Sequence, residues 1–183
     1  VFVFPDISGS MHSPVTGYRK GATSKVRCVD VAALVAAAVL RRNPRAEVIP
    51  FESKALEIGL NPRDSVMTNA EKLASLPSGG TNCSAPLALL NRRKSRGELV
   101  IYVSDSESWI DAPIYGRYGG GATETMKQWA EFKRRNPQAR MVCIDIQPYG
   151  TVKAQEREDI LNVGGFSDQV FELITEFAAG RLS

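Results

Sequence analysis

Short, continuously apolar segments alternate along the chain with longer segments in which apolar residues recur at helical spacing. The first kind is typical of buried strands and the second of helices. The pattern predicts strands at Val1–Pro5, Glu47–Phe51, Lys54–Ile58, Leu99–Val103, Arg140–Ile146 and Gln169–Leu173. It predicts helices at Ser24–Arg42, Ser65–Leu76, Ser84–Arg96, Thr123–Asn136, Lys153–Val163 and Thr175–Leu182. Strands that alternate with helices are joined by right-handed crossovers into a mainly parallel sheet.

The strand pattern also ranks the strands. Leu99–Val103 is apolar throughout, so we expect it at the centre of the sheet with both faces covered. Lys54–Ile58 is expected to pair with Glu47–Phe51 as a hairpin edge. The sequence therefore predicts an α/β fold, a Rossmann-like three-layer sandwich with one antiparallel edge strand in a mainly parallel sheet and helices on both faces. Asp111–Ala122, rich in glycine, is expected to be a surface loop.

Composition indicates one globular domain. The 183 residues are 43% hydrophobic and 23% charged, enough for a core that needs neither disulfide nor structural metal. We expect residues 1–183 to form a single domain, a fragment or C-terminal part of a larger protein, because Val1 opens directly in a strand. The longest apolar run, Val29–Leu40, is shorter than the roughly 20 residues of a membrane span. An odd number of cysteines, 3, favours a reducing compartment, the cytoplasm.

Polar oxygens follow the predicted strands where a parallel α/β fold places its sites. Asp6-Ile7-Ser8-Gly9-Ser10 follows the first strand, Gly79-Gly80-Thr81 precedes a helix, and Asp105 ends the strong strand. Carboxylate and hydroxyl oxygens are the ligands of hard cations, and Mg²⁺ binds one or two carboxylates beside several waters. The sequence predicts a magnesium site at Asp6, Ser8, Ser10, Thr81 and Asp105.

This donor set favours binding over catalysis. Two carboxylates neutralise a divalent cation, so a remaining coordination position can accept a carboxylate from another protein. The set contains no evident general base or activated nucleophile, and we expect no enzyme activity. Phosphoryl transfer on Asp6 with the metal is an alternative, but Ile7 and Ser8 follow Asp6 where such an enzyme needs a second acid. Neither GxGxxG nor GxxxxGK[ST] follows the first strand.

Several residues near the predicted site have two interpretations. His12, Glu107 and Asp111 could enter the second shell of the metal, or be an exposed loop histidine and two solvated acids. Cys83 lies near a helix N-terminus, which could lower its thiol pKa, but a packed thiol fits better in the absence of a base or a CxxC partner.

Nearly half of the 23 Lys and Arg residues follow three of the predicted helices. They are Arg41, Arg42, Arg45, Arg92, Arg93, Lys94, Arg96, Lys133, Arg134, Arg135 and Arg140. In a parallel α/β fold these positions gather at the edge opposite the predicted metal. Cations are favourable at helix C-termini in any case. The alternative is that this basic face binds RNA phosphates or an acidic neighbouring domain, although no strand offers an aromatic stacking platform.

The residues at the predicted metal site resemble a known family. Asp6-Ile7-Ser8-Gly9-Ser10, Thr81 and Asp105 are similar in type, order and position to the metal-ion-dependent adhesion site of von Willebrand factor A domains, and the alternating pattern fits nearly the whole chain. More narrowly, Gly79–Pro86 and Val103–Trp109 resemble the corresponding stretches of the A domain in Ro (TROVE-module) ribonucleoproteins.

The resemblance implies a Rossmann-like fold, Mg²⁺ or Mn²⁺ at the strand tips, and a partner protein that donates an Asp or Glu carboxylate. By similarity, Ser8, Ser10 and Thr81 bind the cation directly, while Asp6 and Asp105 bind it directly or through water. In Ro proteins the A domain closes a ring of helical repeats that binds misfolded and small non-coding RNAs. This chain lacks such repeats, so a non-coding RNA partner would be reached through an N-terminal region that is missing here.

Overall fold

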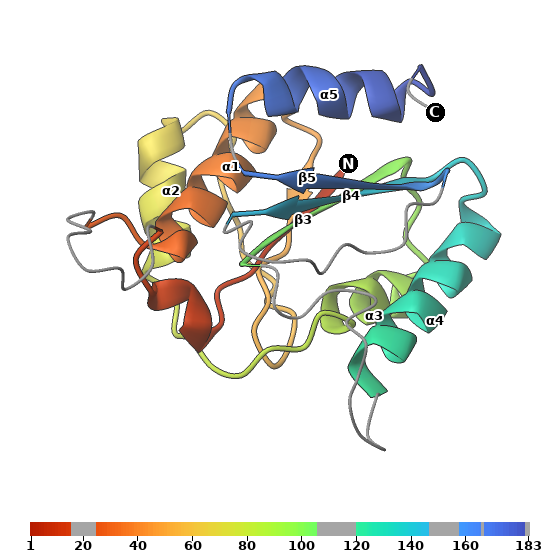
Figure 1. Cartoon of the computed structure of the whole chain (residues 1–183), viewed down its shortest axis with the longest axis horizontal. Helices are drawn as coiled ribbons and strands as arrows, with labels where there is room; N and C mark the ends of the chain where they lie inside the picture. Colours follow the sequence, from red (N-terminus) through yellow and green to blue (C-terminus); the bar gives the residue numbers. More distant parts are fainter. Residues whose placement is uncertain (16–24, 106–119, 147–157, 166, 182–183) are drawn as a thin grey trace.

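A five-stranded, entirely parallel sheet forms the centre of the computed structural model (Figure 1). The structure describes residues 1–15, 25–105, 120–146, 158–165 and 167–181, with the backbone alone at 120–123. The strands run in the order β2-β1-β3-β4-β5. They span Phe2–Pro5 (β1), Glu47–Val48 (β2), Leu99–Ser104 (β3), Arg140–Asp145 (β4) and Ile160–Gly164 (β5).

Helices cover both faces of the sheet, as the sequence predicts. They span Gly9–His12 (η1, a 3₁₀ turn), Cys28–Arg42 (α1), Val66–Ala74 (α2), Ala85–Arg92 (α3), Gly120–Arg135 (α4) and Gln169–Ala178 (α5). Helices α1, α2 and α5 lie on one face, and α3 and α4 lie on the other (Figure 1). The three-layer α/β architecture is confirmed.

The side chains of the central strand β3 pack into two hydrophobic cores, one on each face of the sheet. Its side chains alternate, with Ile101 and Val103 packed towards α1 and α5, and Val100 and Tyr102 packed towards α3 and α4. All six residues of β3 are buried, which confirms its predicted central place. The core on the α3 and α4 face is aromatic, with the Tyr102 ring edge-on to Phe4 at 4.9 Å between centroids.

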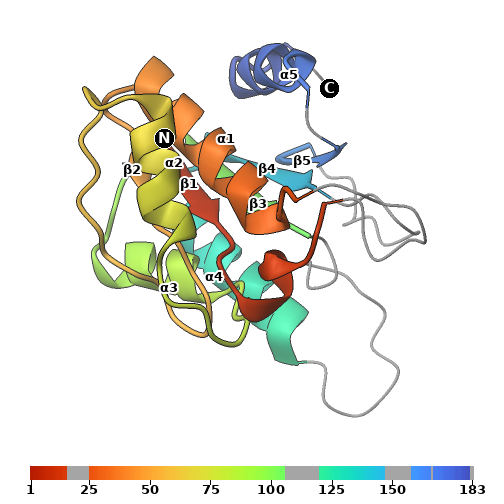
Figure 2. The same cartoon turned by 90° about the vertical axis from the view of Figure 1, so that its left-hand side faces the viewer.

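The order of the strands determines where a site can form. From β1 the chain passes through α1 to β2 on one side, and it later returns to β3 on the other side of β1. The helices that follow β1 and β3, α1 and α4, lie on opposite faces of the sheet, and in parallel α/β folds sites form at the carboxyl edge beside such a change in strand order. Figure 2 shows the turn η1 at this edge, between the end of β1 and the start of α1.

The predicted antiparallel edge strand at Lys54–Ile58 is wrong. All pairs between the described strands are parallel, and the hairpin is reduced to one isolated antiparallel bridge between Phe51 and Ala55. The backbone turns tightly there, because the Glu52 N–H donates to the Lys54 carbonyl at 3.0 Å. Pro50 has no N–H to extend a ladder, so the segment does not continue as a strand.

Near the C-terminus, one segment predicted as a helix is a strand, and one segment predicted as a strand is part of a helix. Ile160–Gly164 is strand β5 paired with β4, although the prediction placed Ile160–Val163 at the end of a helix that begins at Lys153. Gln169–Leu173, predicted as a strand, is the first half of α5. The local sequence pattern was misleading in both places. Strand β5 is specified by its pairing with the edge of β4. In α5, the apolar residues Val170, Ile174 and Phe177 show helical spacing only when the whole segment is considered.

The boundaries of the other elements differ modestly from the prediction. Helix α1 begins at Cys28 rather than Ser24, which lies outside the described residues, and α4 begins at Gly120, inside the predicted loop Asp111–Ala122. The rest of that loop and the first part of Lys153–Val163 are also outside the described residues. Within the part of the chain that is described, no helix is long and apolar enough to cross a membrane.

Gly97 packs against the aromatic core, and its substitution tests that packing. A Cβ at Gly97 would lie 2.5 Å from Cε2 of the buried Phe2 ring. We expect Gly97→Ala to lower the free energy of unfolding by about 1–3 kcal/mol, as overpacking does, in urea denaturation. Gly59→Ala is the matched control, because no atom lies within 4 Å of its Cβ position. Equal stability of the two variants would contradict this packing.

Candidate functional site

Asp6 is the centre of the polar cluster at the carboxyl edge of the sheet. It follows β1 directly and is fully buried. One carboxylate oxygen, Oδ1, accepts the Ser8 N–H at 2.8 Å, and Oδ2 accepts the Ser104 hydroxyl at 2.7 Å. Its backbone N–H donates to the Val103 carbonyl at 2.9 Å. The side chain is thus held in one orientation by the turn after β1 and by the last residue of β3.

Asp105 places a second carboxylate beside the first. It follows β3 and is 8% exposed, and β3 is the neighbour of β1 in the sheet. Burial raises the pKa of Asp6, and the charge of Asp105 raises it further, while the hydrogen bonds from Ser8 and Ser104 oppose the rise. Among the described residues, no Lys, Arg or His side chain pairs with Asp6 or Asp105. The two acids therefore form a buried site of negative charge that protein cations do not neutralise.

The turn after Asp6 adds two hydroxyl groups. Ser8 is buried and Ser10 is exposed, and their Oγ atoms lie 3.4 Å apart. The backbone between them forms the 3₁₀ turn η1, in which the Met11 N–H donates to the Ser8 carbonyl at 3.0 Å. The alternating spacing of Asp6, Ser8 and Ser10 therefore brings their side chains to one place, as the sequence predicts.

The loop that carries Thr81 is bonded to the same edge. The Gly9 N–H donates to the Gly79 carbonyl at 2.9 Å, which joins this loop to the turn after β1. Two residues beyond Thr81, the Cys83 carbonyl accepts the hydroxyl of the buried Tyr102 on β3 at 2.6 Å. Thr81 itself is exposed, so its hydroxyl is open to solvent at this edge.

The donor set at this edge is suited to a hard cation. The predicted metal-site residues combine two carboxylates with three hydroxyls, which are oxygen ligands of the kind that Mg²⁺ and Mn²⁺ accept. The described residues contain no group of three or more His, Cys, Asp and Glu side chains placed for a metal. The described residues therefore offer no cluster of nitrogen and sulfur ligands for a soft metal. A cation site at this edge would need the serine and threonine hydroxyls as ligands.

His12 lies beside this site but bonds away from it. Its Nδ1 lies 3.1 Å from Nη1 of Arg27, and because a guanidinium only donates, Nδ1 is the acceptor. Arg27 in turn pairs with Asp30 at 2.9 Å in the first turn of α1. The side chain of His12 is half-buried, so the expectation of an exposed loop histidine is wrong. The other two residues considered for a second shell, Glu107 and Asp111, lie outside the described residues.

The three cysteines are free and buried. Burial raises the pKa of Cys83 to about 12, and the neighbouring charges of Asp6 and Asp105 raise it in the same direction. The packed-thiol interpretation of Cys83 therefore fits, and a lowered pKa at the helix N-terminus does not.

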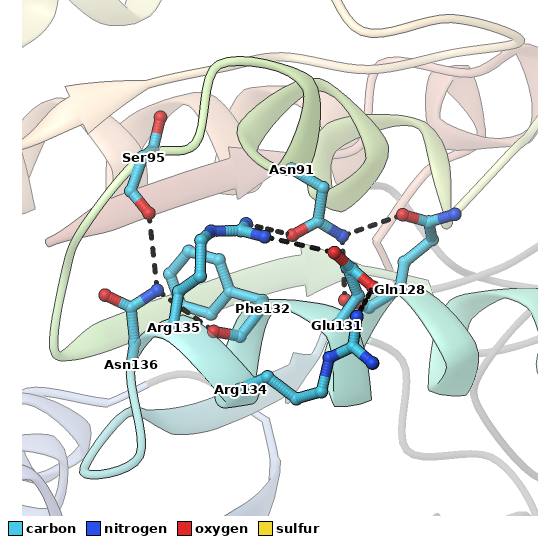
Figure 3. A network of polar contacts seen from close by, with 8 residues as sticks. All are labelled: Asn91, Ser95, Gln128, Glu131, Phe132, Arg134, Arg135 and Asn136. Atoms are coloured by element: carbon cyan, nitrogen blue, oxygen red, sulfur yellow. Dashed lines mark hydrogen bonds and ion pairs between the residues drawn. The ribbon is translucent and has the colours of Figure 1, made fainter.

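The predicted basic residues lie at the ends of α1, α3 and α4, at the amino edge of the strands. Several of them are engaged within the fold (Figure 3). Arg134 and Arg135 both pair with Glu131, and Arg135 also donates to Asn91 on α3. Arg93 binds the carboxylates of Glu47 at 2.6 Å and Glu57 at 2.9 Å. These cations hold helices and strands together, and their charge is partly neutralised.

Other members of the basic set cover apolar surface or form no ion pair. The guanidinium groups of Arg42 and Arg140 lie over the rings of Phe171 and Phe177 on α5, at 4.4 and 5.1 Å from the ring centroids. Lys133 lies over the Trp129 ring at 5.8 Å from its centroid, donates to the Ala139 carbonyl at 2.8 Å and pairs with Asp159 at 3.8 Å. Within the described ranges, no ion pair is formed by Arg41, Arg45, Arg92, Lys94 or Arg96. Fewer of these cations are therefore free to bind a partner than the sequence alone suggests.

Sequence reasoning missed two residues of the site. Ser104 is the residue before Asp105, and its hydroxyl binds Asp6 rather than pointing to solvent. Glu52 follows the predicted strand Glu47–Phe51 and is 9% exposed, beneath the loop at Gly79. The same signal could have found both: a polar residue directly at the carboxyl end of a buried strand.

Comparison with known proteins gives one consistent family. The family model of the Ro60 vWA domain matches residues 1–178. The RNA-binding protein RO60 of Deinococcus radiodurans is 25% identical over 177 residues, which are 97% of this chain and 31% of that protein. The chain therefore spans about a third of the length of this relative.

Two solved structures have a similar fold. The crystal structure of the Deinococcus radiodurans RO (RSR) protein superposes with a TM-score of 0.71 at 23% identity, covering 99% of this chain and 34% of that one. Proximal thread matrix protein 1 from the mussel byssus superposes with a TM-score of 0.55 at 15% identity, covering 97% of this chain and 43% of that one. With the family model matched over nearly its whole length, the chain belongs to the family of Ro60 vWA domains.

Proposed function

We propose that this domain is a non-enzymatic binding module that depends on a divalent cation. Asp6, Ser8, Ser10, Thr81 and Asp105 hold Mg²⁺ or Mn²⁺ at the carboxyl edge of the sheet, and a partner protein supplies an Asp or Glu carboxylate to the cation. The adhesion sites of von Willebrand factor A domains, which these residues resemble, work in this way.

One observation carries the proposal: two buried carboxylates lie beside each other without a protein cation among the described residues. Burial disfavours the ionised form of Asp6 and raises its pKa, and repulsion from the charge of Asp105 adds to the rise. A bound divalent cation removes that repulsion and the cost of desolvation together. The Ser8 and Ser10 hydroxyls, 3.4 Å apart, add neutral ligands without adding charge.

The same charge count supports a protein partner. A divalent cation held by two protein carboxylates is electrically neutral, so a third carboxylate from outside meets no net repulsion there. Ser10 and Thr81 are exposed, which leaves the outer side of the site open to a partner.

The Asp6→Asn variant tests the cation site, because it should remove cation binding without lowering the stability of the fold. Because the pKa of Asp6 is raised in the folded state, its ionised form destabilises the metal-free protein at neutral pH, and that cost is relieved as pH falls through the raised pKa. We expect Asp6→Asn to raise the free energy of unfolding in chelator, on the order of 1 kcal/mol. Mg²⁺ at 100 times its Kd should stabilise the wild type by about 2.7 kcal/mol and leave the variant unchanged, in thermal unfolding.

Asp64→Asn is the matched control, since Asp64 pairs with Lys72 on the surface near α2. It should respond to Mg²⁺ like the wild type. Equal stabilisation of the wild type and Asp6→Asn by Mg²⁺, or of neither, would contradict the proposed site.

Lowering the pH should weaken Mg²⁺ binding, because protons compete for a ligand carboxylate. The pKa of Asp6 is raised, so the affinity should begin to fall at a higher pH than for an ordinary aspartate site. Calorimetric titration of Mg²⁺ across roughly pH 4 to 8, a window around a carboxyl pKa, measures this. An affinity that is constant over the window would exclude Asp6 as a ligand.

RNA binding is a second candidate, favoured by the Deinococcus radiodurans relative, which is an RNA-binding protein. Arg92 ends α3 and Lys94 and Arg96 follow it within four residues, and none of the three forms an ion pair within the described residues. Such a group of cations can bind phosphates without disturbing the fold. We propose this segment as the point where RNA contacts the domain.

Charge reversal at these three residues tests RNA contact. We expect the triple variant Arg92→Glu, Lys94→Glu, Arg96→Glu to bind a single-stranded RNA oligonucleotide more weakly. The slope of log affinity against log salt should fall by about 0.7 for each phosphate that the variant no longer neutralises. Fluorescence anisotropy measures the affinity, and the same reversal at Lys54, Lys72 and Lys127 is the control. Equal weakening in both variants would indicate non-specific attraction and sink this candidate.

A further inference from the structure

Glu52 lies directly beneath the loop that carries Thr81. It follows Phe51, which forms a parallel bridge with Asp6 and accepts the Ile7 N–H at 2.9 Å through its carbonyl. The residue is 9% exposed although it is charged. A buried carboxylate needs specific partners, so its surroundings indicate what it does.

The carboxylate of Glu52 is held in one orientation by its neighbour. Oε2 accepts the Ser53 N–H at 2.8 Å and the Ser53 hydroxyl at 2.6 Å. These two bonds lower the pKa of Glu52, so the group is ionised at neutral pH. Charge-assisted bonds of this kind are stronger than neutral ones and resist rotation of the side chain.

One backbone hydrogen bond and two close approaches, measured from the positions that a Cβ would take at Gly79 and Gly80, join Glu52 and Ser53 to the Thr81 loop. The Glu52 carbonyl accepts the Asn82 N–H at 2.8 Å, directly after Thr81. Before Thr81, Gly79 rests on the Glu52 carboxylate so closely that a Cβ there would lie 2.0 Å from Oε2. The Cβ of Ser53 lies 3.7 Å from the Cβ position of Gly80. Thr81 is therefore flanked on both sides by residues that Glu52 and Ser53 contact.

The loop above Glu52 also reaches the other half of the site. The Gly79 carbonyl accepts the Gly9 N–H at 2.9 Å, and Gly9 lies between Ser8 and Ser10. A shift of Gly79 consequently moves the backbone that presents Thr81 and the backbone that presents the two serines.

We infer that Glu52 is a positioning residue for the divalent-cation site, acting through Gly79 and Asn82 on the loop that presents Thr81. The inference rests on the proposed function, and it adds a residue that is not itself a ligand. Groups that orient metal ligands commonly change metal affinity by about 10–100-fold when they are removed.

The experiment compares Glu52→Ala, Glu52→Gln, Gly79→Ala and the double variant Glu52→Ala, Gly79→Ala. Mg²⁺ affinity is measured by calorimetry well below each melting temperature, and exchange of the Gly9 and Asn82 amide protons is measured by NMR in chelator. Glu71→Ala, on the exposed face of α2, is the control for removal of a carboxylate.

We expect Glu52→Ala to weaken Mg²⁺ binding about tenfold or more and to speed exchange at both amides. Glu52→Gln should stay close to the wild type, because its side-chain oxygen can still accept from Ser53. Gly79→Ala should weaken Mg²⁺ binding by displacing the carboxylate, and it should add little in the Glu52→Ala background, since both changes break the same packing.

Each other outcome overturns the inference. Unchanged Mg²⁺ affinity in Glu52→Ala, with binding by the wild type, rejects it while the proposed cation site stands. Equal losses of affinity in Glu52→Gln and Glu52→Ala show that the charge matters and positioning does not. Failure of the wild type to bind Mg²⁺ or Mn²⁺ rejects the proposed function and this inference with it.

Discussion

The burial of two carboxylates side by side at the tips of neighbouring parallel strands is the constraint on which this edge of the domain depends. Asp6 and Asp105 occupy these positions because β1 and β3 are neighbours and end at the same level. Hydrogen bonds from Ser8 and Ser104 partly stabilise Asp6, yet its pKa stays raised. An ionised buried pair of this kind is costly without a cation, and the proposed cation site rests on that cost.

The rest of the fold keeps this pair in place. The strand order changes direction at β1, and the Gly9–Gly79 and Asn82–Glu52 backbone bonds join the loop that carries Thr81 to the segments after β1 and β2. The amino edge of the sheet, on the opposite side, carries cations instead of buried acids. There the cations of α4 bind Glu131 and Asn91 and close the contact between helices, so part of a basic pattern that suggested nucleic acid serves the fold instead.

The sequence predicted most of the elements and the place of Asp6, Ser8, Ser10 and Asp105 at the carboxyl edge, for identifiable reasons. A strand such as Leu99–Val103 is apolar throughout and belongs at the centre of a sheet, and the oxygen-rich residues after it must lie at the carboxyl edge. Where the deciding interaction is distant in sequence, local pattern failed. β5 is specified by its pairing with β4, and α5 by the packing of its apolar side chains against the sheet at β4. Lys54–Ile58 is not a strand because Pro50 and a tight turn stop the pairing. The sequence pattern does not indicate the roles of Ser104 and Glu52, because these roles depend on contacts with Asp6 and Gly79, which are distant in sequence.

The most direct test of the account is crystallography of the protein grown in Mn²⁺, with anomalous diffraction measured near the manganese absorption edge. The account predicts one strong anomalous peak at the carboxyl edge, surrounded by oxygens of Asp6, Ser8, Ser10, Thr81 and Asp105. A structure at saturating Mn²⁺ concentration with no peak there, or with the peak bound by other residues, would contradict it.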